Sequence, residues 1–82
     1  MNEIKKEKML MNLEYELICK MIKLRKDANL SQQQLADISH VIRTTIARIE
    51  NGMNSPQLKT LLSILEPLGF TLEIVPLKKF DE

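Results

Sequence analysis

The sequence has no tryptophan, one tyrosine and two phenylalanines, so its core has to be built from aliphatic side chains. Its single cysteine, Cys19, excludes an internal disulfide and suits a reducing compartment. No apolar run reaches the roughly 18 to 20 residues that a membrane span requires, and the N-terminus has no apolar signal core. These absences predict a cytoplasmic protein without a membrane partner.

Patterns for catalysis and metal binding are also missing. One histidine, His40, and one cysteine cannot form a metal site, and there is no glycine-rich phosphate loop and no nucleophile beside a base. The 82 residues make one domain at most, with little volume for a pocket. We therefore expect no enzyme, no metal and no cofactor.

Charge of one sign is scarce as well. The formal net charge is only +1, which is low for a nucleic-acid binder, because lysine and arginine contacts to phosphate supply most nonspecific affinity. Residues 1–26 nevertheless hold seven of the twelve basic side chains against four acids. The bulk charge neither supports nor excludes DNA as a partner.

The segment from Asn2 to Asp27 contains neither glycine nor proline, and its apolar residues recur at helical spacing. They form two stripes roughly 140° apart around the helix axis. One stripe is Leu13, Leu17, Met21 and Leu24, and the other is Met11, Tyr15, Ile18 and Ile22. The pattern predicts a long N-terminal helix with two faces to bury. Either both faces pack within one monomer, or one packs on the domain and the other on a partner chain.

Two short helices are predicted next. Ser31 and Gln34 fit a capping box, in which each side chain accepts the other residue's backbone N–H, so a helix begins there. A further helix begins at about Ile42, and Gly52 ends it because glycine tolerates the left-handed conformation. The apolar faces of the two helices consist of Leu35 with Ile38 and of Ile46 with Ile49.

A fourth, strongly amphipathic helix is predicted after residue 55. Ser55 can cap it and Pro56 suits its first position, and the helix should end near Glu66–Pro67. Its apolar stripe, at positions i, i+3, i+4 and i+7, is Leu58, Leu61, Leu62 and Leu65. Gly69 then separates this helix from the C-terminal segment.

One β-strand is predicted in residues 70–77, because apolar and polar residues alternate there with period two. Its apolar members are Phe70, Leu72 and Ile74. A lone strand needs a partner for its backbone donors and acceptors, and no other segment of the chain resembles a strand. We expect the same strand of a second copy to be that partner, across a two-fold axis; an extended tail laid on the core is the alternative.

Two short helices joined by a turn, with the second free to enter the major groove, make up a helix-turn-helix. Residues 30–52 have this layout, and residues 30–69 resemble, without gaps, the Cro/C1-type (XRE) domain of the lambda-repressor-like fold. The residues that carry the resemblance are Gln32, Leu35, Ala36, Ile46, Ile49, Glu50 and Gly52. With its flanks, over residues 12–77, the sequence is similar to HigA-type and HipB-type antitoxins.

The resemblance implies an all-α, lambda-repressor-like bundle of four to five helices with one short C-terminal β-strand paired across a dimer. Its parts would be the long first helix (1–29), the helix-turn-helix core (30–69), the dimerisation strand (70–77) and a tail (78–82). The implied partners are double-stranded DNA with a palindromic operator, a second copy of the chain and a toxin protein.

The predicted recognition helix exposes the face opposite its two buried isoleucines. On that face lie Thr44, Ala47, Arg48 and Asn51, with Arg43 at the flank. Arginine can donate two hydrogen bonds to guanine, and threonine can bond a base or offer its methyl group to thymine. Arg43 and Arg48 also occupy positions that the family uses for bases. We therefore expect Arg43, Thr44 and Arg48 to contact bases.

Contacts to the phosphate backbone are expected mainly from Gln32, which resembles the family's phosphate-binding glutamine at the positive start of a helix. The other phosphate candidates are Ile42, Asn51, Asn54 and Ser55. The resemblance also pairs Arg25 with Glu50, an ion pair that links the first helix to the end of the recognition helix. We assign this pair a structural role, because it orients the reading helix.

Three positions depart from the family. His40 stands where glycine is usual in the motif turn, at a positive φ that histidine adopts less readily than glycine. Ile42 replaces the usual Ser or Thr cap, which forgoes about 1 kcal/mol, and can instead touch a sugar or a thymine methyl group. Met53 stands where many relatives carry a cation. That loss, with the low net charge, predicts a weak monomer affinity that dimerisation over two half-sites would offset.

The expected function is that of a sequence-specific transcriptional repressor. The resemblance to antitoxins makes it the antitoxin of a type II toxin–antitoxin pair that autoregulates its operon. Two alternatives stay open: a stand-alone XRE-family regulator without a toxin partner, and a protein-interaction module that has lost DNA binding.

Overall fold

The computed structural model describes residues 2–77, so the predicted tail, 78–82, lies outside the described residues. The elements in this part of the chain are α1 (Glu3–Asp27), α2 (Gln32–Ser39), α3 (Arg43–Glu50), α4 (Leu58–Leu65) and a 3₁₀ turn, η1 (Glu66–Leu68). The all-α class and the helix-turn-helix order of α2 and α3 are confirmed. Within residues 2–77, no helix is both long and apolar enough to cross a membrane.

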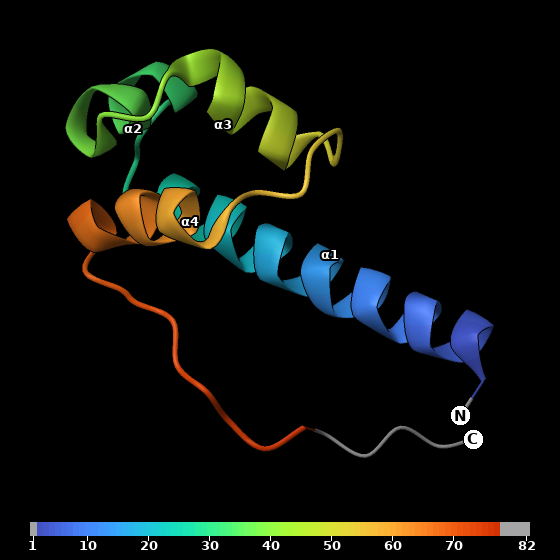
Figure 1. Ribbon diagram of the computed structural model, residues 1–82. Coiled ribbons are helices and arrows are strands. Elements are labelled where there is room, and N and C mark those ends of the chain that lie inside the picture. Colours follow the sequence, from blue (N-terminus) through green and yellow to red (C-terminus); the bar gives the residue numbers. More distant parts are fainter. Residues whose placement is uncertain (1, 78–82) are drawn as a thin grey trace.

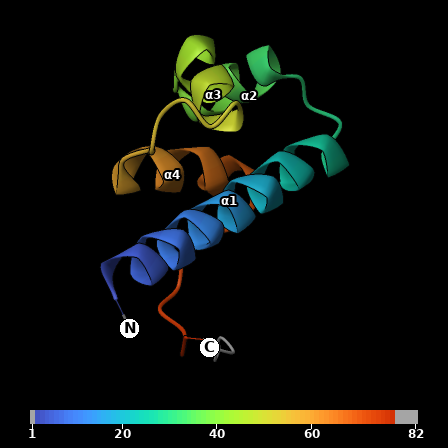
Figure 2. The ribbon, with the colours of Figure 1, turned by 90° about the vertical axis from the view of Figure 1, so that its right-hand side faces the viewer.

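The helices form two layers. Figure 1 shows α2 and α3 side by side above α1 and α4, and Figure 2 gives the same separation from the side. Helix α2 contacts α3, α4 and η1, while α1 contacts α3. The N-terminal half of α1 extends beyond the other helices (Figure 1). The helix-turn-helix unit is therefore carried on a platform made by the C-terminal half of α1 and by α4.

The core between the layers is aliphatic, as the shortage of aromatic residues predicts. Each of the four helices contributes to it: Ile18, Met21, Leu35, Ala36, Ile46, Ile49, Leu61, Ile64 and Leu65. Burial of each large aliphatic side chain stabilises the fold by about 1.5 to 3 kcal/mol. This core fixes which faces of α2 and α3 remain at the surface.

Helix α1 begins at a capped N-terminus, where the Asn2 side chain accepts the Lys5 N–H at 2.9 Å. It ends where Asn29 adopts the left-handed conformation (φ 58°) and the Leu30 N–H bonds to the Arg25 carbonyl at 3.1 Å. The two predicted stripes are not both buried within the monomer. Only the C-terminal members of each stripe reach the core, because no other helix lies beside the N-terminal half of α1 in residues 2–77.

The exposed members include Met11 and Tyr15, with 69% and 70% of their surface accessible. The expectation that both stripes pack within one monomer is therefore wrong for this half of the helix. The alternative, in which a partner chain covers one face, stays a prediction.

Two other predicted faces are displaced. In α2, Ile38 is 46% exposed, and Ala36 is buried beside Leu35 in its place. In α4, the buried stripe is Leu61, Ile64 and Leu65, whereas Leu58 and Leu62 are exposed. This stripe is rotated by roughly 60° from the predicted one, at about 100° per residue. Both faces follow from the angle at which a helix meets its neighbours, which periodicity alone does not fix.

The start of α4 also differs from the prediction. The N-cap is Gln57, whose side chain makes no capping hydrogen bond, and Ser55–Pro56 belong to the preceding loop. The predicted end is close, since η1 follows directly and Gly69 stops it at φ 88°. The proline therefore shapes the approach to the helix and does not occupy its first turn.

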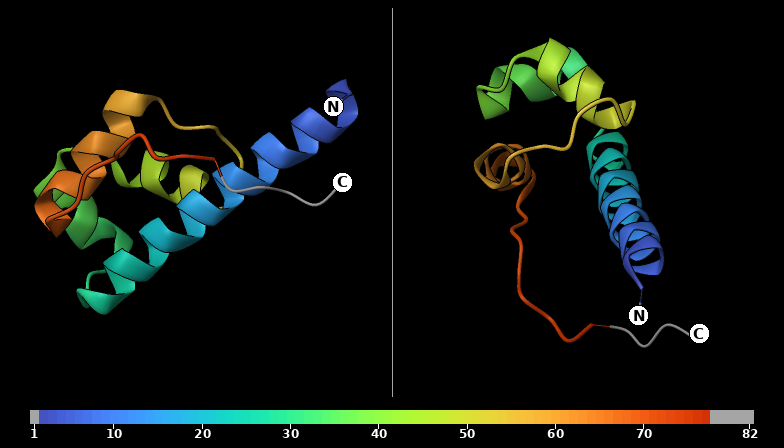
Figure 3. Two further views of the ribbon diagram at one scale, coloured as in Figure 1. Left: turned by 90° about the horizontal axis from the view of Figure 1, so that it is seen from below. Right: turned by 45° about the vertical axis from the view of Figure 1, so that its right-hand side comes forward.

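The C-terminal strand is not formed in the described residues, where 70–77 have no regular secondary structure. Figures 1 and 3 show this segment leaving α4 on the side away from α2 and α3. A strand needs hydrogen bonds from a neighbouring strand, and residues 2–77 of one chain contain no other strand. Leu72 packs against the core, while Phe70 and Ile74 are 51% and 101% exposed.

Candidate nucleic-acid interface

The first helix of the motif, α2, starts at the predicted capping box. The Ser31 hydroxyl accepts the Gln34 N–H at 3.0 Å, and the Gln34 side-chain oxygen accepts the Ser31 N–H at 2.8 Å. These bonds satisfy two backbone donors that the helix itself leaves unpaired. The start of α2 is therefore fixed by local sequence, and with it the position of Gln32.

The motif turn runs through His40, which adopts the left-handed conformation at φ 61° and ψ 24°. Its N–H still bonds to the Ala36 carbonyl at 3.0 Å. The role of Ser39 was not foreseen from the sequence: this residue is buried, and its hydroxyl accepts the Val41 N–H at 3.3 Å. A serine hydroxyl can accept the backbone N–H two residues further along the chain, so a serine at the end of α2 is the sequence signal for this bond. This bond spans His40 and so supports the turn.

Helix α3 is held by its inner face. Ile46 and Ile49 are 0% and 1% exposed, and Ile42, at the N-cap, offers only its carbonyl to the Thr45 and Ile46 N–H groups. Its C-terminus is closed by Gly52 at φ 73°. The next residue's N–H, on Met53, bonds to the Arg48 carbonyl at 2.9 Å.

The outer face of α3 carries the predicted base-reading residues. Arg43, Thr44 and Arg48 are exposed, and Ala47 between them is half-buried. Neither arginine takes part in an ion pair within residues 2–77. Two guanidinium groups and a hydroxyl are thus available on one face of a rigidly held helix.

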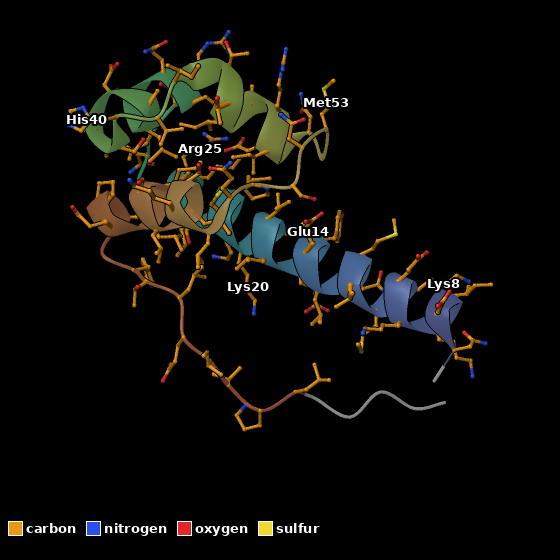
Figure 4. The ribbon with its side chains drawn as sticks, viewed as in Figure 1. Lys8, Glu14, Lys20, Arg25, His40 and Met53 are labelled. Carbon is orange, nitrogen blue, oxygen red and sulfur yellow. The ribbon has the colours of Figure 1, made fainter. Side chains whose placement is uncertain are left out.

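Beneath this helix lies a hydrogen-bond network centred on Arg25, which Figure 4 shows between α1 and the upper layer. Its guanidinium binds the Glu50 carboxylate through two bonds of 2.8 and 2.9 Å and donates a third, of 2.8 Å, to the Leu30 carbonyl. Gln32 donates its side-chain amide to the same carboxylate at 3.0 Å. Four segments of the chain meet at one buried ion pair: α1, its following loop, the start of α2 and the end of α3.

The surroundings of this ion pair favour the charged form of both residues. Burial by itself would raise the pKa of Glu50, but hydrogen bonds from Arg25 and Gln32, with the positive charges of Arg25 and Lys26, hold that pKa below its usual value. The hydrogen bond to Glu50 likewise raises the pKa of Arg25, and burial opposes that effect only in part. Both groups are therefore charged at neutral pH.

The predicted phosphate-binding residues lie at different places around α3. Gln32 is half-buried and tied to Glu50, so one of its two amide hydrogens is already used. Asn51, Asn54 and Ser55 are exposed at and after the C-terminal end of α3, whereas Ile42 lies at its start. The network therefore brings Gln32 to the same end of α3 as Asn51 and leaves Ile42 apart. The bond between Gln32 and Glu50 was not foreseen from the sequence.

A helix-turn-helix whose second helix exposes two arginines, held on a long helix by a buried ion pair, defines an XRE-type DNA-binding protein. The helix-turn-helix family matches residues 21–75, and the chain belongs to this family. It is thus a DNA-binding regulator of transcription, and the family consists of regulators and not of enzymes.

Two similar proteins narrow the class. An uncharacterized HTH-type transcriptional regulator of Haemophilus influenzae is 51% identical over 67 residues, which make up 82% of this chain and 68% of that protein. Among solved structures, a toxin–antitoxin module from Streptococcus pneumoniae is 38% identical with a TM-score of 0.73. The match covers 90% of this chain and 81% of the other.

Proposed function

We propose that the protein is a dimeric repressor that reads a palindromic operator, and the antitoxin of a type II toxin–antitoxin pair that autoregulates its operon. The observation that carries this proposal is the outer face of α3, where Arg43, Thr44 and Arg48 are exposed on a helix fixed from beneath. Similarity to a toxin–antitoxin module supports a toxin as the protein partner. Gln32, Asn51, Asn54 and Ser55 are the proposed phosphate contacts.

The reading face is tested by binding to the DNA upstream of the protein's own gene, measured by fluorescence anisotropy at fixed salt. Arg43→Ala and Arg48→Ala should each weaken binding by about 1 to 3 kcal/mol per half-site. Lys20→Ala is the matched control, because it also removes one exposed positive charge but lies on α1, where Figure 4 shows Lys20 pointing away from α3. Equal losses for all three variants would mean that only bulk charge is sensed.

The proposed dimer uses residues 70–77 as a strand that pairs with the same strand of a second copy. Three observations support it: residues 70–77 have no secondary structure of their own, Leu72 packs against the core, and Ile74 is completely exposed. Ile74→Pro removes a backbone donor from the strand, so it should lower the mass measured by sedimentation. Ile74→Val keeps the strand propensity and should stay dimeric. A dimer unchanged by proline would refute strand pairing.

The toxin partner is tested by expressing the chain together with the product of the adjacent open reading frame. A stable complex on size exclusion, and tighter repression of the shared promoter than by either protein alone, would support the antitoxin. A chain that represses but forms no complex is a stand-alone regulator. A chain that forms the complex and binds no DNA is an interaction module.

A further inference from the structure

The N-cap of the recognition helix carries an apolar side chain at a place where a polar one would stabilise the fold. Ile42 makes no capping hydrogen bond, and 71% of its surface is exposed. Serine, threonine, asparagine or aspartate there would bond to a free N–H of the first turn. The stability of α3 therefore does not explain why residue 42 is an isoleucine. The exposed side chain of Ile42 is instead available for an apolar contact with a molecule bound at the start of α3.

Ile42 lines a shallow hollow between α2 and the start of α3. The residues around this hollow are Gln33, Ala36, Asp37, His40, Val41, Ile42 and Arg43. The Gln33 amide is bonded to the Asp37 carboxylate at 2.9 Å, so these two polar groups satisfy each other at the rim. Ala36, Val41 and Ile42 provide an apolar wall, and Arg43 follows directly on the exposed face of α3.

An apolar wall beside a guanidinium matches a pyrimidine methyl group that lies next to a guanine. In the major groove, the methyl group at C5 of thymine is the apolar group among the base edges, and arginine recognises guanine through O6 and N7. A 5-methylcytosine presents the same methyl group. If the hollow met only water, nothing would compensate the missing cap.

We propose that Ile42 is a specificity-determining residue, and that its hollow receives the C5 methyl group of a pyrimidine next to the base that Arg43 reads. The inference rests on the proposed DNA binding and adds to it one position of the operator. The preference for a pyrimidine with a C5 methyl group over one without it should be modest, because removing one buried methyl group corresponds to about a fourfold change in affinity. It should also vanish when the isoleucine side chain is shortened.

The experiment uses the full chain and a duplex selected by that chain from a random library. Each thymine is replaced in turn by deoxyuridine, which lacks only the methyl group. At one thymine position per half-site, the wild type should bind the deoxyuridine duplex about fourfold more weakly than the thymine duplex. Ile42→Ala should bind both duplexes equally. Leu58→Ala, which shortens another exposed aliphatic side chain outside the hollow and the core, should keep the wild-type preference.

A second arm separates the methyl group from the rest of thymine. At the same position, a C·G pair should bind about fourfold more tightly once its cytosine carries a C5 methyl group. If deoxyuridine has no effect at any position while Arg43→Ala still weakens binding, the inference is overturned and the proposed function survives. A preference that persists in Ile42→Ala also overturns it, because another residue then reads the methyl group. If the wild type selects no duplex, both proposals are overturned together.

Discussion

The buried pair between Arg25 and Glu50 permits a sharp test of what holds the recognition helix in place, through Glu50→Gln. The substitution keeps the size of the side chain but leaves the Arg25 guanidinium, with only 10% of its side chain exposed, without a counter-charge. Breaking a buried pair in this way costs about 3 to 5 kcal/mol. We expect about 3 kcal/mol, since glutamine keeps one oxygen to accept a hydrogen bond.

A loss of that size is large for a chain of 82 residues. Domains of this length unfold with about 4 to 12 kcal/mol in total, at roughly 0.05 to 0.15 kcal/mol per residue. At roughly 4 to 8 °C per kcal/mol, the melting temperature should fall by about 12 to 24 °C. Thermal and urea unfolding followed by circular dichroism measure both quantities, at one protein concentration because a dimer would make stability concentration-dependent.

The matched control is the ion pair between Lys23 and Asp27, which has the same distance of 2.8 Å but side chains that are 75% and 61% exposed. Asp27→Asn should change stability by at most about 0.5 kcal/mol, because water screens the exposed pair. The two ion pairs thus have the same shortest distance but differ in burial and in the number of hydrogen bonds to the carboxylate. If Glu50→Gln destabilised the chain no more than Asp27→Asn, the network would not be what fixes α3.

The pH dependence of stability gives a second measurement on the same pair. The pKa of Glu50 is lowered in the folded chain, so its contribution is present above the unfolded value of about 4.3 and is lost as the pH falls through the folded pKa. Glutamine does not titrate in this range. The stability difference between the wild type and Glu50→Gln should therefore narrow as the pH falls below the unfolded value of about 4.3 and through the folded pKa, and a constant difference would contradict the assignment.

Further predictions concern the helices of the motif. Leu35→Ala should cost about 2 to 5 kcal/mol in urea unfolding, against less than about 0.5 kcal/mol for Ile38→Ala in the same helix, because only the first side chain is buried. Ile42→Ser should raise stability by about 1 kcal/mol by adding the missing cap, while removing the proposed methyl contact. Gly52→Ala should cost about 1 kcal/mol; the strain at φ 73° is its only cause, since nothing lies within 4 Å of the added carbon.

Features set by neighbouring residues could be predicted from the sequence. The capping box at Ser31 and Gln34 and the helix stop at Gly52 depend on hydrogen bonds and backbone angles within a few positions. The isoleucines of α3 also follow from periodicity, because Ile46 and Ile49 are the only large apolar residues of this helix and lie on one face. Residues that are adjacent along the chain decide each of these features.

Features set by distant elements could not be predicted in the same way. Ile64 replaces Leu58 in the core because distant elements such as α2 determine which side of α4 is covered, and all these positions are equally apolar. The bond from Gln32 to Glu50 joins residues 18 positions apart, so no local pattern indicates it. The predicted strand at 70–77 is not formed in the single chain that the structure describes, and its proposed pairing needs a second copy, which no local pattern can supply.

The low charge of one copy links dimerisation to DNA binding. With a net charge of +1 and two exposed arginines on α3, one copy can neutralise few phosphates, and affinity depends on how many are neutralised. A second copy doubles that number and presents a second reading helix at a fixed spacing, which turns the second contact into an intramolecular event. Dimerisation is therefore part of the proposed reading mechanism, and a variant that stays monomeric, such as Ile74→Pro, should lose operator binding even though the segment 70–77 leaves α4 on the side away from α3.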